Sequence, residues 1–485
     1  MFKNPIDKLA VKTAGWIAAV FLLCHFTKSA AIVLLAAWGV SCALRKRFGY
    51  AWGAYLVLGL SVVTNVALMP KGAFFSLGVR FGFLILGAAL AYAGLNERTS
   101  ENSKVPLLPL VPYLLAAALF SIWGFAPIVS ELKLVQFFIF LYSLYFGLRG
   151  LVYRPEEAFR FRAMTFGVIL VFVFGSALAY FVPSVGYSMS LGGGMDALGD
   201  PEASMFVREQ MANAESLMLF SGITGQSQVI GALFPCFFFW LACDMLFVEG
   251  KVGGLHLYTL ITMLPIIYLS RSRLGLLGLL ASFAVIYFYL MPRIQLSAHV
   301  RDRVRQGMFI GLLFVAAAAI TAEVRSQSIT RWLRKTENVG GDTRSLKQAV
   351  TDSRQGLIQQ SLWEYRRSPL IGSGFQVSYW HVMLVRRSRG LILSAPIEKG
   401  LTPLMVLGET GIFGSILFWI FIVTFLMKCG ERRLRMTLGG FLVFFAANMG
   451  EATFFSPGGI GGAEWIVCLG GGFLLDITLR QMRRM

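Results

Sequence analysis

Long apolar runs separated by short polar loops dominate the chain. Most runs are about 17–25 residues long, the length with which an α-helix crosses the hydrocarbon core of a bilayer. The pattern predicts a helical hairpin over residues 14–44, turned near residues 27–29. Further spans are predicted at residues 51–69, 73–95, 107–126, 131–150, 163–183, 218–248, 254–270, 274–291, 307–322, 401–427, 436–449 and 460–479. The sequence therefore predicts an all-α polytopic membrane protein of about 12–14 transmembrane helices, twelve if the hairpin does not cross fully.

Composition supports a membrane protein over a set of soluble domains. Hydrophobic residues make up 56% of the 485 residues and charged residues only 14%, whereas soluble domains average about 25% charged residues. The spans divide the chain into N-terminal transmembrane helices (1–322), a long polar loop domain (323–400) that contains helices, and C-terminal transmembrane helices (401–485). An even number of spans places both termini on one side.

Basic residues gather in the short loops on one side of the predicted bundle. Five loops or tails carry them: Arg45, Lys46 and Arg47; Arg149, Arg154, Arg160 and Arg162; Arg293, Arg301, Arg303 and Arg305; Lys428, Arg432, Arg433 and Arg435; Arg480, Arg483 and Arg484. Because positively charged short loops stay in the cytoplasm, this side is predicted to be cytoplasmic. The segment 323–400 then faces the periplasm of a bacterial inner membrane. Long segments cross regardless of their charge, so its arginines do not alter this topology.

The net charge of +19 does not indicate a nucleic-acid partner, because much of it lies in these topological loops. The six cysteines lie in or beside apolar runs, and none falls in the long outer segment. No set of cysteines and histidines has zinc-site spacing. We expect no disulfide, no metal site and no cofactor.

Two places in the sequence bring charge to the predicted outer face of the membrane that the chain spans. The first is Ser270-Arg271-Ser272-Arg273, which lies between two apolar runs with almost no loop. Charge near the membrane is costly and points to function; these arginines either bind an anionic ligand or snorkel to lipid phosphate.

The second place is the long segment itself. Residues 343–367 are predicted to form a helix that ends at Ser368-Pro369, with Lys347 and Arg354 on one stripe. The run Pro369-Leu-Ile-Gly-Ser-Gly-Phe375 follows as a glycine turn, whose amides could approach an anion. The segment is either a site for a phosphorylated ligand or a solvated basic surface.

These runs resemble signatures of the O-antigen ligase/polymerase superfamily. Ser270-Arg271-Ser272-Arg273-Leu-Gly is similar to its SRG signature, and Arg354…Trp363…Pro369-Leu-Ile-Gly-Ser-Gly-Phe375 to its R…W…PLxGxGF signature. Glu409-Thr-Gly-Ile-Phe-Gly414 resembles its ExGxxG helix, and Gly222-Ile-Thr-Gly-Gln-Ser-Gln228 is a weaker match to a GxxGNPN entry to a span. The resemblance covers about the second half of the chain.

The resemblance implies a metal-independent, C-type glycosyltransferase-like fold that takes a glycan from undecaprenyl diphosphate at the periplasmic face. It assigns Arg271 or Arg273, together with Arg354, to the diphosphate, since guanidinium forks bind phosphate and offset developing charge. Further substrate contacts are expected from Lys347, Trp363, Gly372, Gly374, Arg386, Arg387, Lys399 and Glu451.

One departure from the pattern concerns the general base. Ligases of this superfamily carry a His-Asn before the ExGxxG helix, but here Glu398-Lys399 occupies that place, and His381 lies well upstream. Glu398 is the first candidate for the base and His381 the second. Alternatively, Glu398 pairs with Lys399 or a nearby arginine, and His381 packs in a loop.

The missing histidine favours a polymerase of lipid-linked repeat units, for exopolysaccharide, capsule or O-antigen. The alternatives are an O-antigen ligase, a protein O-oligosaccharyltransferase and, more distantly, a polysaccharide or lipid transporter or flippase. A transporter predicts charges at the middle of several spans, whereas Arg80 and Lys133 are the few charges inside or near spans. Expected partners are lipid-linked donor and acceptor glycans and membrane lipids, with a chain-length regulator and a flippase as candidates. Sugar, linkage and oligomeric state stay open.

Overall fold

The computed structural model describes residues 4–27, 30–65, 68–69, 73–97, 104–189, 218–250, 254–294, 302, 358–359, 361–377, 401–450 and 453–483. Labels with η mark a 3₁₀ turn (η2) and π-helical turns (the others), several of which continue an α-helix. The elements are α1 (Pro5–Thr27), α2 (Ala30–Leu44), α3 (Phe48–Ser61), α4 (Ala73–Leu95), η2 (Leu108–Leu110), α5 (Val111–Ser121), α6 (Pro127–Tyr142), η3 (Ser143–Gly147), α7 (Arg149–Val152), α8 (Pro155–Ala179), α9 (Pro183–Gly186), β1 (Tyr187–Met189), β2 (Met218–Phe220), α11 (Ser227–Cys243), η4 (Asp244–Glu249), α12 (Gly254–Leu269), α13 (Arg273–Ala284), η5 (Val285–Leu290), α18 (Thr402–Glu431), α19 (Arg435–Asn448), α20 (Gly459–Glu464), η6 (Trp465–Gly471) and α21 (Gly472–Met482).

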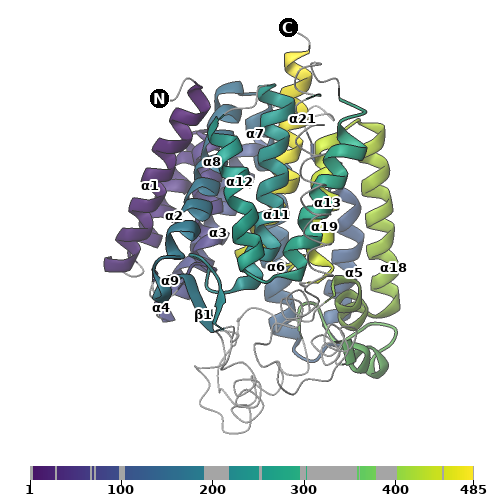
Figure 1. The fold of residues 1–485 in the computed structure, drawn as a ribbon. Coiled ribbons are helices and arrows are strands. Elements are labelled where there is room, and N and C mark those ends of the chain that lie inside the picture. Colours follow the sequence, from purple (N-terminus) through teal and green to yellow (C-terminus); the bar gives the residue numbers. More distant parts are fainter. Residues whose placement is uncertain are drawn as a thin grey trace, which may run out of the picture.

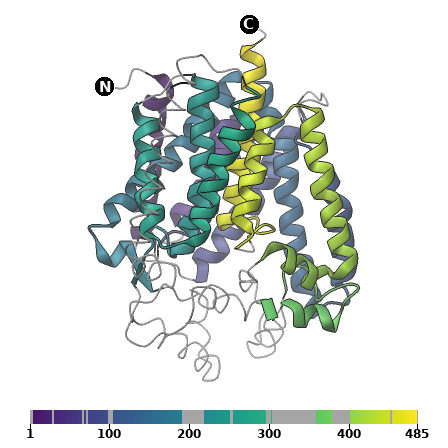
Figure 2. The same ribbon diagram turned by 45° about the vertical axis from the view of Figure 1, so that its right-hand side comes forward.

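The long helices form one bundle with two distinct ends. Helix α1 begins and α21 ends at the same end (Figure 1), which we call the inner end. The short sheet of β1 and β2 lies at the opposite, outer end, where residues 361–377 meet the beginning of α18 (Figure 2). The predicted hairpin is present, because α1 ends at Thr27 and α2 begins at Ala30.

The helices identify a multi-pass membrane protein. Within the described ranges, eight helices are long and apolar enough to cross a bilayer, and three shorter apolar helices accompany them. Apart from the two-stranded sheet, the regular elements described are helical. The predicted span at 307–322 lies outside the described residues, as does most of the predicted loop domain 323–400.

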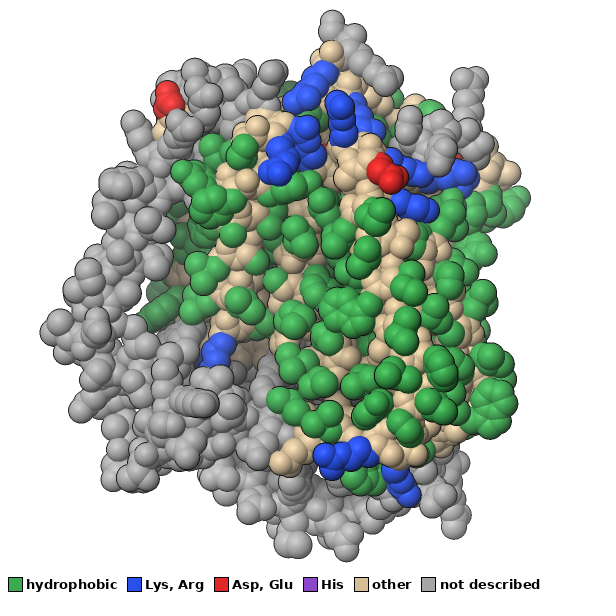
Figure 3. Space-filling model, turned by 90° about the vertical axis from the view of Figure 1, so that its right-hand side faces the viewer, with side chains coloured by type: hydrophobic (Ala, Val, Ile, Leu, Met, Phe, Trp, Pro, Cys, Tyr) green, Lys and Arg blue, Asp and Glu red, His purple; other side chains and the backbone are tan. Residues whose placement is uncertain are grey.

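The outermost helices carry their apolar side chains outward. Large hydrophobic residues on α18 are exposed at helical spacing along one face: Ile412, Ile416, Trp419, Ile420, Val423 and Met427. Helix α11 is instead buried on all sides, apart from its first turn. Figure 3 shows a broad band of hydrophobic side chains across the middle of one face of the molecule, with a group of Lys and Arg above the band and a few below it. This arrangement fits a bundle whose outer surface faces lipid.

Buried charges hold the inner end together. Arg162 Nε on α8 lies 2.7 Å from Asp244 Oδ1 on η4. The His256 ring on α12 lies between Asp244, at 3.5 Å, and Asp7 of α1, at 3.3 Å. Buried charges require partners of this kind, so the cluster fixes α1, α8, η4 and α12 relative to one another. The sequence did not predict it.

The sidedness of the bundle is a prediction that cysteine labelling tests. Ser184 on α9 is exposed at the outer end, and Arg433, after α18, is exposed at the inner end. The six native cysteines are buried, so the background should be low. In intact cells we expect an impermeant maleimide to label Ser184→Cys and Gly341→Cys but not Arg433→Cys, which should react only after the membrane is opened. The reverse pattern would invert the assigned topology.

Candidate functional site

Two of the sequence motifs, far apart along the chain, interlock at the outer end. Residues 369–377 run against residues 408–413 of α18, and we call these two segments the joint. Their backbones are joined by hydrogen bonds from Ser373 N to Gly408 O (2.9 Å), Gly374 N to Glu409 O (2.9 Å), Ile412 N to Pro369 O (2.9 Å) and Phe413 N to Leu370 O (3.4 Å). The PLIGSGF and ETGIFG runs therefore form one structural unit.

Glycines allow this close approach. Gly372 has φ of 75°, and a Cβ atom there would lie 2.3 Å from the Glu409 carbonyl carbon. Gly411 interrupts the helical geometry of α18 with φ of 62° and ψ of −165°. Its Cβ atom would lie 2.4 Å from the backbone of Leu370. Both positions need glycine for conformation and for space.

The backbone amides of the glycine turn are used within the protein. Those of Gly372, Ser373 and Gly374 donate to carbonyl oxygens. The Phe375 amide donates to Ser121 Oγ at 3.0 Å, and the Gln376 amide to Glu409 Oε2 at 2.8 Å. In this geometry the turn serves packing, and an anion contact by Gly372 or Gly374 stays a prediction.

Gln376 connects the joint to two other parts of the outer end. Its carbonyl oxygen accepts a hydrogen bond of 2.7 Å from Lys133 Nζ on α6, and its side-chain amide donates to the Phe455 carbonyl oxygen. Glu409 is fully buried and Lys133 almost so. Thus a carboxylate and an ammonium group, both inside the bundle, hold the N–H and the C=O of the same residue.

A second buried polar cluster lies beside the joint, where α19 ends. Asn448 Nδ2 lies 3.1 Å from Glu464 Oε2, and Thr453 Oγ1 lies 2.9 Å from Asn448 Oδ1. The hydroxyl of Thr402, at the start of α18, donates to the Asn448 carbonyl oxygen at 2.9 Å. The outer end therefore holds fixed carboxylate, amide and hydroxyl groups above an aromatic core that includes Phe454 and Trp465.

The Ser270–Arg273 turn opens α13 at the same end. Ser272 caps the helix by accepting a hydrogen bond from Gly275 N at 3.2 Å, and Arg271 takes φ of 49°, rare for a residue other than glycine. Leu274 lies against Gly450, just after α19. The turn thus borders the Asn448 cluster, and both arginines are half-buried and hold interactions.

The predicted site is described only in part. Residues 361–367 are helical and this helix ends at Arg367, just before Ser368-Pro369, as predicted for the end of the helix. Trp363 is 42% exposed, and the Arg367 guanidinium lies 4.9 Å from the centroid of the Trp363 ring. Eight predicted residues lie outside the described residues: Lys347, Arg354, His381, Arg386, Arg387, Glu398, Lys399 and Glu451.

The structure adds residues to which the sequence assigned no role. Lys133 stood out only as a charge inside a span, and Glu409 only as part of a motif. Gln376 follows the glycine turn but carries no pattern of its own, and Glu464 is a lone acid at the start of a glycine-rich span. Each is recognisable only once the segments are placed side by side.

The fold defines the class of the protein as a multi-pass helical membrane protein, and its outer end carries the buried polar groups described above. The chain matches no protein-family model and no curated protein. A reaction can therefore be assigned only from the residues themselves.

Proposed function

We propose that the protein is a glycosyltransferase that polymerises glycan repeat units carried on undecaprenyl diphosphate, at the periplasmic face of a bacterial inner membrane. The observation that carries the proposal is the joint. Two motifs that resemble this superfamily's signatures interlock at one end of the bundle, with the third, arginine-bearing motif opening α13 at that end.

The proposed reaction is an inverting displacement. A hydroxyl oxygen of the acceptor glycan attacks the anomeric carbon of the donor glycan, and the bond from that carbon to the diphosphate oxygen breaks. Arg271 or Arg273, with Arg354, binds the lipid diphosphate that leaves and offsets its charge. Glu398 takes the proton of the attacking hydroxyl, with His381 as the alternative base.

Within this proposal the joint has a positioning role. Residues 369–377 connect the predicted helix that carries Arg354 to the segment that carries Glu398, and the joint fixes this connection to α18. Reacting groups must be held within fractions of an ångström for efficient transfer. A rigid anchor, built from backbone hydrogen bonds and a buried Lys133–Gln376–Glu409 arrangement, meets that need.

A deletion strain tests the reaction type. Without the protein, we expect single repeat units to accumulate on the lipid carrier and long polymer to vanish, because chain growth stops while assembly of the unit continues. Mass spectrometry of the lipid fraction and gel analysis of polymer length measure both, with the wild-type gene on a plasmid as the control. Polymer of normal length that stays on the lipid carrier would instead indicate a ligase. Glycans that are unchanged in the deletion strain would refute both the polymerase and the ligase assignments.

A further inference from the structure

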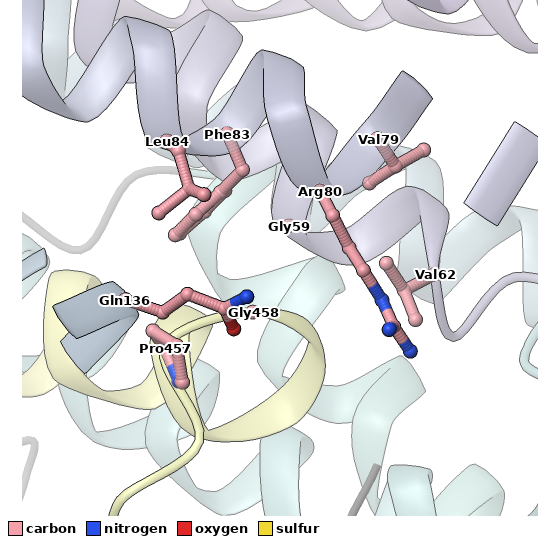
Figure 4. Close-up of a pocket in the computed structure, with 9 residues that line it drawn as sticks. All are labelled: Gly59, Val62, Val79, Arg80, Phe83, Leu84, Gln136, Pro457 and Gly458. Atoms are coloured by element: carbon pink, nitrogen blue, oxygen red, sulfur yellow. The ribbon is translucent and has the colours of Figure 1, made fainter. Parts of the chain in front are cut away.

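A small pocket opens between three helices close to the joint. Figure 4 shows its lining, which comes from α3, α4, α6 and the loop before α20. It holds about 50 Å³ of free space, whereas one water needs about 10–15 Å³. The lining residues are Gly59, Val62, Val79, Arg80, Phe83, Leu84, Gln136, Pro457 and Gly458. The pocket therefore has room for a group larger than one water, such as a phosphoryl group.

Arg80 is the single charged residue of this lining. It is the third residue of the apolar span Gly78–Leu95, near its outer end. It is half-buried, and among the described residues it has neither a carboxylate partner nor a hydrogen bond. A guanidinium group among apolar side chains is costly without a counter-charge. The positive charge of Arg80 therefore has no counter-charge within the lining, and the pocket suits an anion.

The second polar group of the pocket is the side chain of Gln136. Its amide points toward the hollow in Figure 4. Guanidinium N–H groups and an amide NH₂ are hydrogen-bond donors, so they favour the oxygen atoms of a phosphate. The rest of the lining is apolar or glycine, which suits the first carbons of a lipid chain rather than a free, hydrated ion.

The pocket adjoins the candidate site through two shared elements. Gln136 lies one turn along α6 from Lys133, which donates to the Gln376 carbonyl oxygen, so the two side chains lie on adjacent parts of the same helix face. Pro457 and Gly458 follow Phe455, whose carbonyl oxygen accepts from Gln376. A phosphate held by Arg80 would therefore lie beside the joint, at the depth of the outer end of α4.

We propose that this pocket binds the phosphate group of a second lipid carrier, the one whose glycan is the acceptor. This inference rests on the proposed function, because joining two lipid-linked glycans requires two phosphate sites. The arginines of the Ser270–Arg273 turn and Arg354 serve the diphosphate that leaves, whereas the phosphate at Arg80 does not react and only positions its glycan.

Three variants of the pocket separate its charge from its shape. Arg80→Gln removes the charge, and Arg80→Lys keeps it without the planar fork. Gly458→Leu fills the hollow while keeping Arg80; a Cβ atom there meets nothing within 4 Å, and φ of −106° suits any residue. The matched control is Gly430→Leu in α18, where a Cβ atom also meets nothing within 4 Å. Arg293→Gln, at the inner end, controls for loss of one positive charge.

Binding of radiolabelled farnesyl monophosphate to the purified full chain in nanodiscs of neutral lipid tests the site directly. We expect Arg80→Gln and Gly458→Leu to weaken binding about tenfold, which corresponds to about 1.4 kcal/mol, Arg80→Lys to weaken it less, and both controls to match the wild type. Unchanged binding in Gly458→Leu would mean that Arg80 only snorkels to bulk lipid, and would overturn the proposal. Binding of inorganic phosphate in place of the lipid would overturn it as well.

A turnover assay distinguishes failure of this inference from failure of the proposed function. With separate donor and acceptor lipids, we expect Arg80→Gln and Gly458→Leu to raise the KM for the acceptor about tenfold and to leave the KM for the donor unchanged. If wild-type protein forms polymer and these variants do not change the acceptor KM, the pocket assignment is wrong and the proposed function stands. If wild-type protein binds farnesyl monophosphate through Arg80 but forms no polymer, the proposed function fails, and with it the acceptor role.

Discussion

Gly411→Ala is expected to open the joint. Its φ of 62° and ψ of −165° lie in a region of the Ramachandran plot that essentially only glycine adopts. Holding another residue in this conformation costs about 1–3 kcal/mol of conformational free energy. The new Cβ atom would also lie 2.4 Å from the Leu370 backbone, which cannot rotate away as a side chain could. We expect faster tryptic cleavage after Arg366 and Arg367, a lower melting temperature, and transfer activity reduced about tenfold or more.

The control for this substitution lies in the same helix. Gly430→Ala places a methyl group where nothing lies within 4 Å, in a helical position that favours alanine. We expect it to match or slightly exceed the stability of the wild type. Equal tryptic rates and melting temperatures for Gly411→Ala and Gly430→Ala would show that the close contact between Gly411 and Leu370 is not needed.

Arg354→Lys is expected to fail nearly as badly as Arg354→Ala, while the protein still inserts and expresses. A guanidinium group binds a phosphate with two parallel hydrogen bonds, and lysine keeps the charge but not this geometry. Loss of one such contact in the transition state costs about 3 kcal/mol, or about a hundredfold in rate. Single-turnover rates with a lipid-diphosphate donor measure the effect, and Arg293→Lys at the inner end is the control.

Glu398→Gln provides the contrast that separates the two roles. A base acts after the donor is bound, so this variant should bind donor as the wild type does and be slow in transfer. Arg354→Ala should weaken donor binding as well. Full activity of Arg354→Ala would remove Arg354 from the site, and full activity of Glu398→Gln would leave the base unidentified.

The helices that match the sequence best are those whose apolar runs end at abrupt polar or glycine signals. The predicted spans 73–95, 254–270 and 274–291 correspond closely to α4, α12 and α13 with η5. In each case the hydrophobic run and the helix share their ends, because a chain in a bilayer must keep its backbone hydrogen bonds inside the helix until it reaches water.

Spans that end in packed loops were predicted less well. The apolar run at 51–69 continues past α3, but the helix stops at Ser61. There Thr64 pairs with Thr224, and the backbone N–H of Asn65 donates to the Ile223 carbonyl oxygen at 2.8 Å. Hydropathy cannot distinguish an apolar helix from an apolar loop that bonds to a distant strand-like segment.

The joint could not be predicted from periodicity at all. The break at Gly411 is hidden inside the apolar run 401–427, and it becomes intelligible only when residues 369–375 lie against it. The motifs indicated that both runs matter, but not that they touch. The backbone amides of residues 373–376 donate to groups of α5 and α18, and the bond from the Phe375 amide to Ser121 joins residues 254 positions apart.

The hydrogen bonds of Gln376 have a consequence for biosynthesis. Lys133 is synthesised 243 residues before Gln376, whose carbonyl oxygen it binds. Phe455, whose carbonyl oxygen accepts a hydrogen bond from the Gln376 side chain, is synthesised 79 residues after Gln376. The early helices enter the membrane long before either bond can form. Only when residue 455 has emerged from the ribosome do all the partners of Gln376 exist. The outer end is therefore among the last parts of the protein to mature, and a chain cut short before Phe455 would lack one of the hydrogen bonds that hold Gln376.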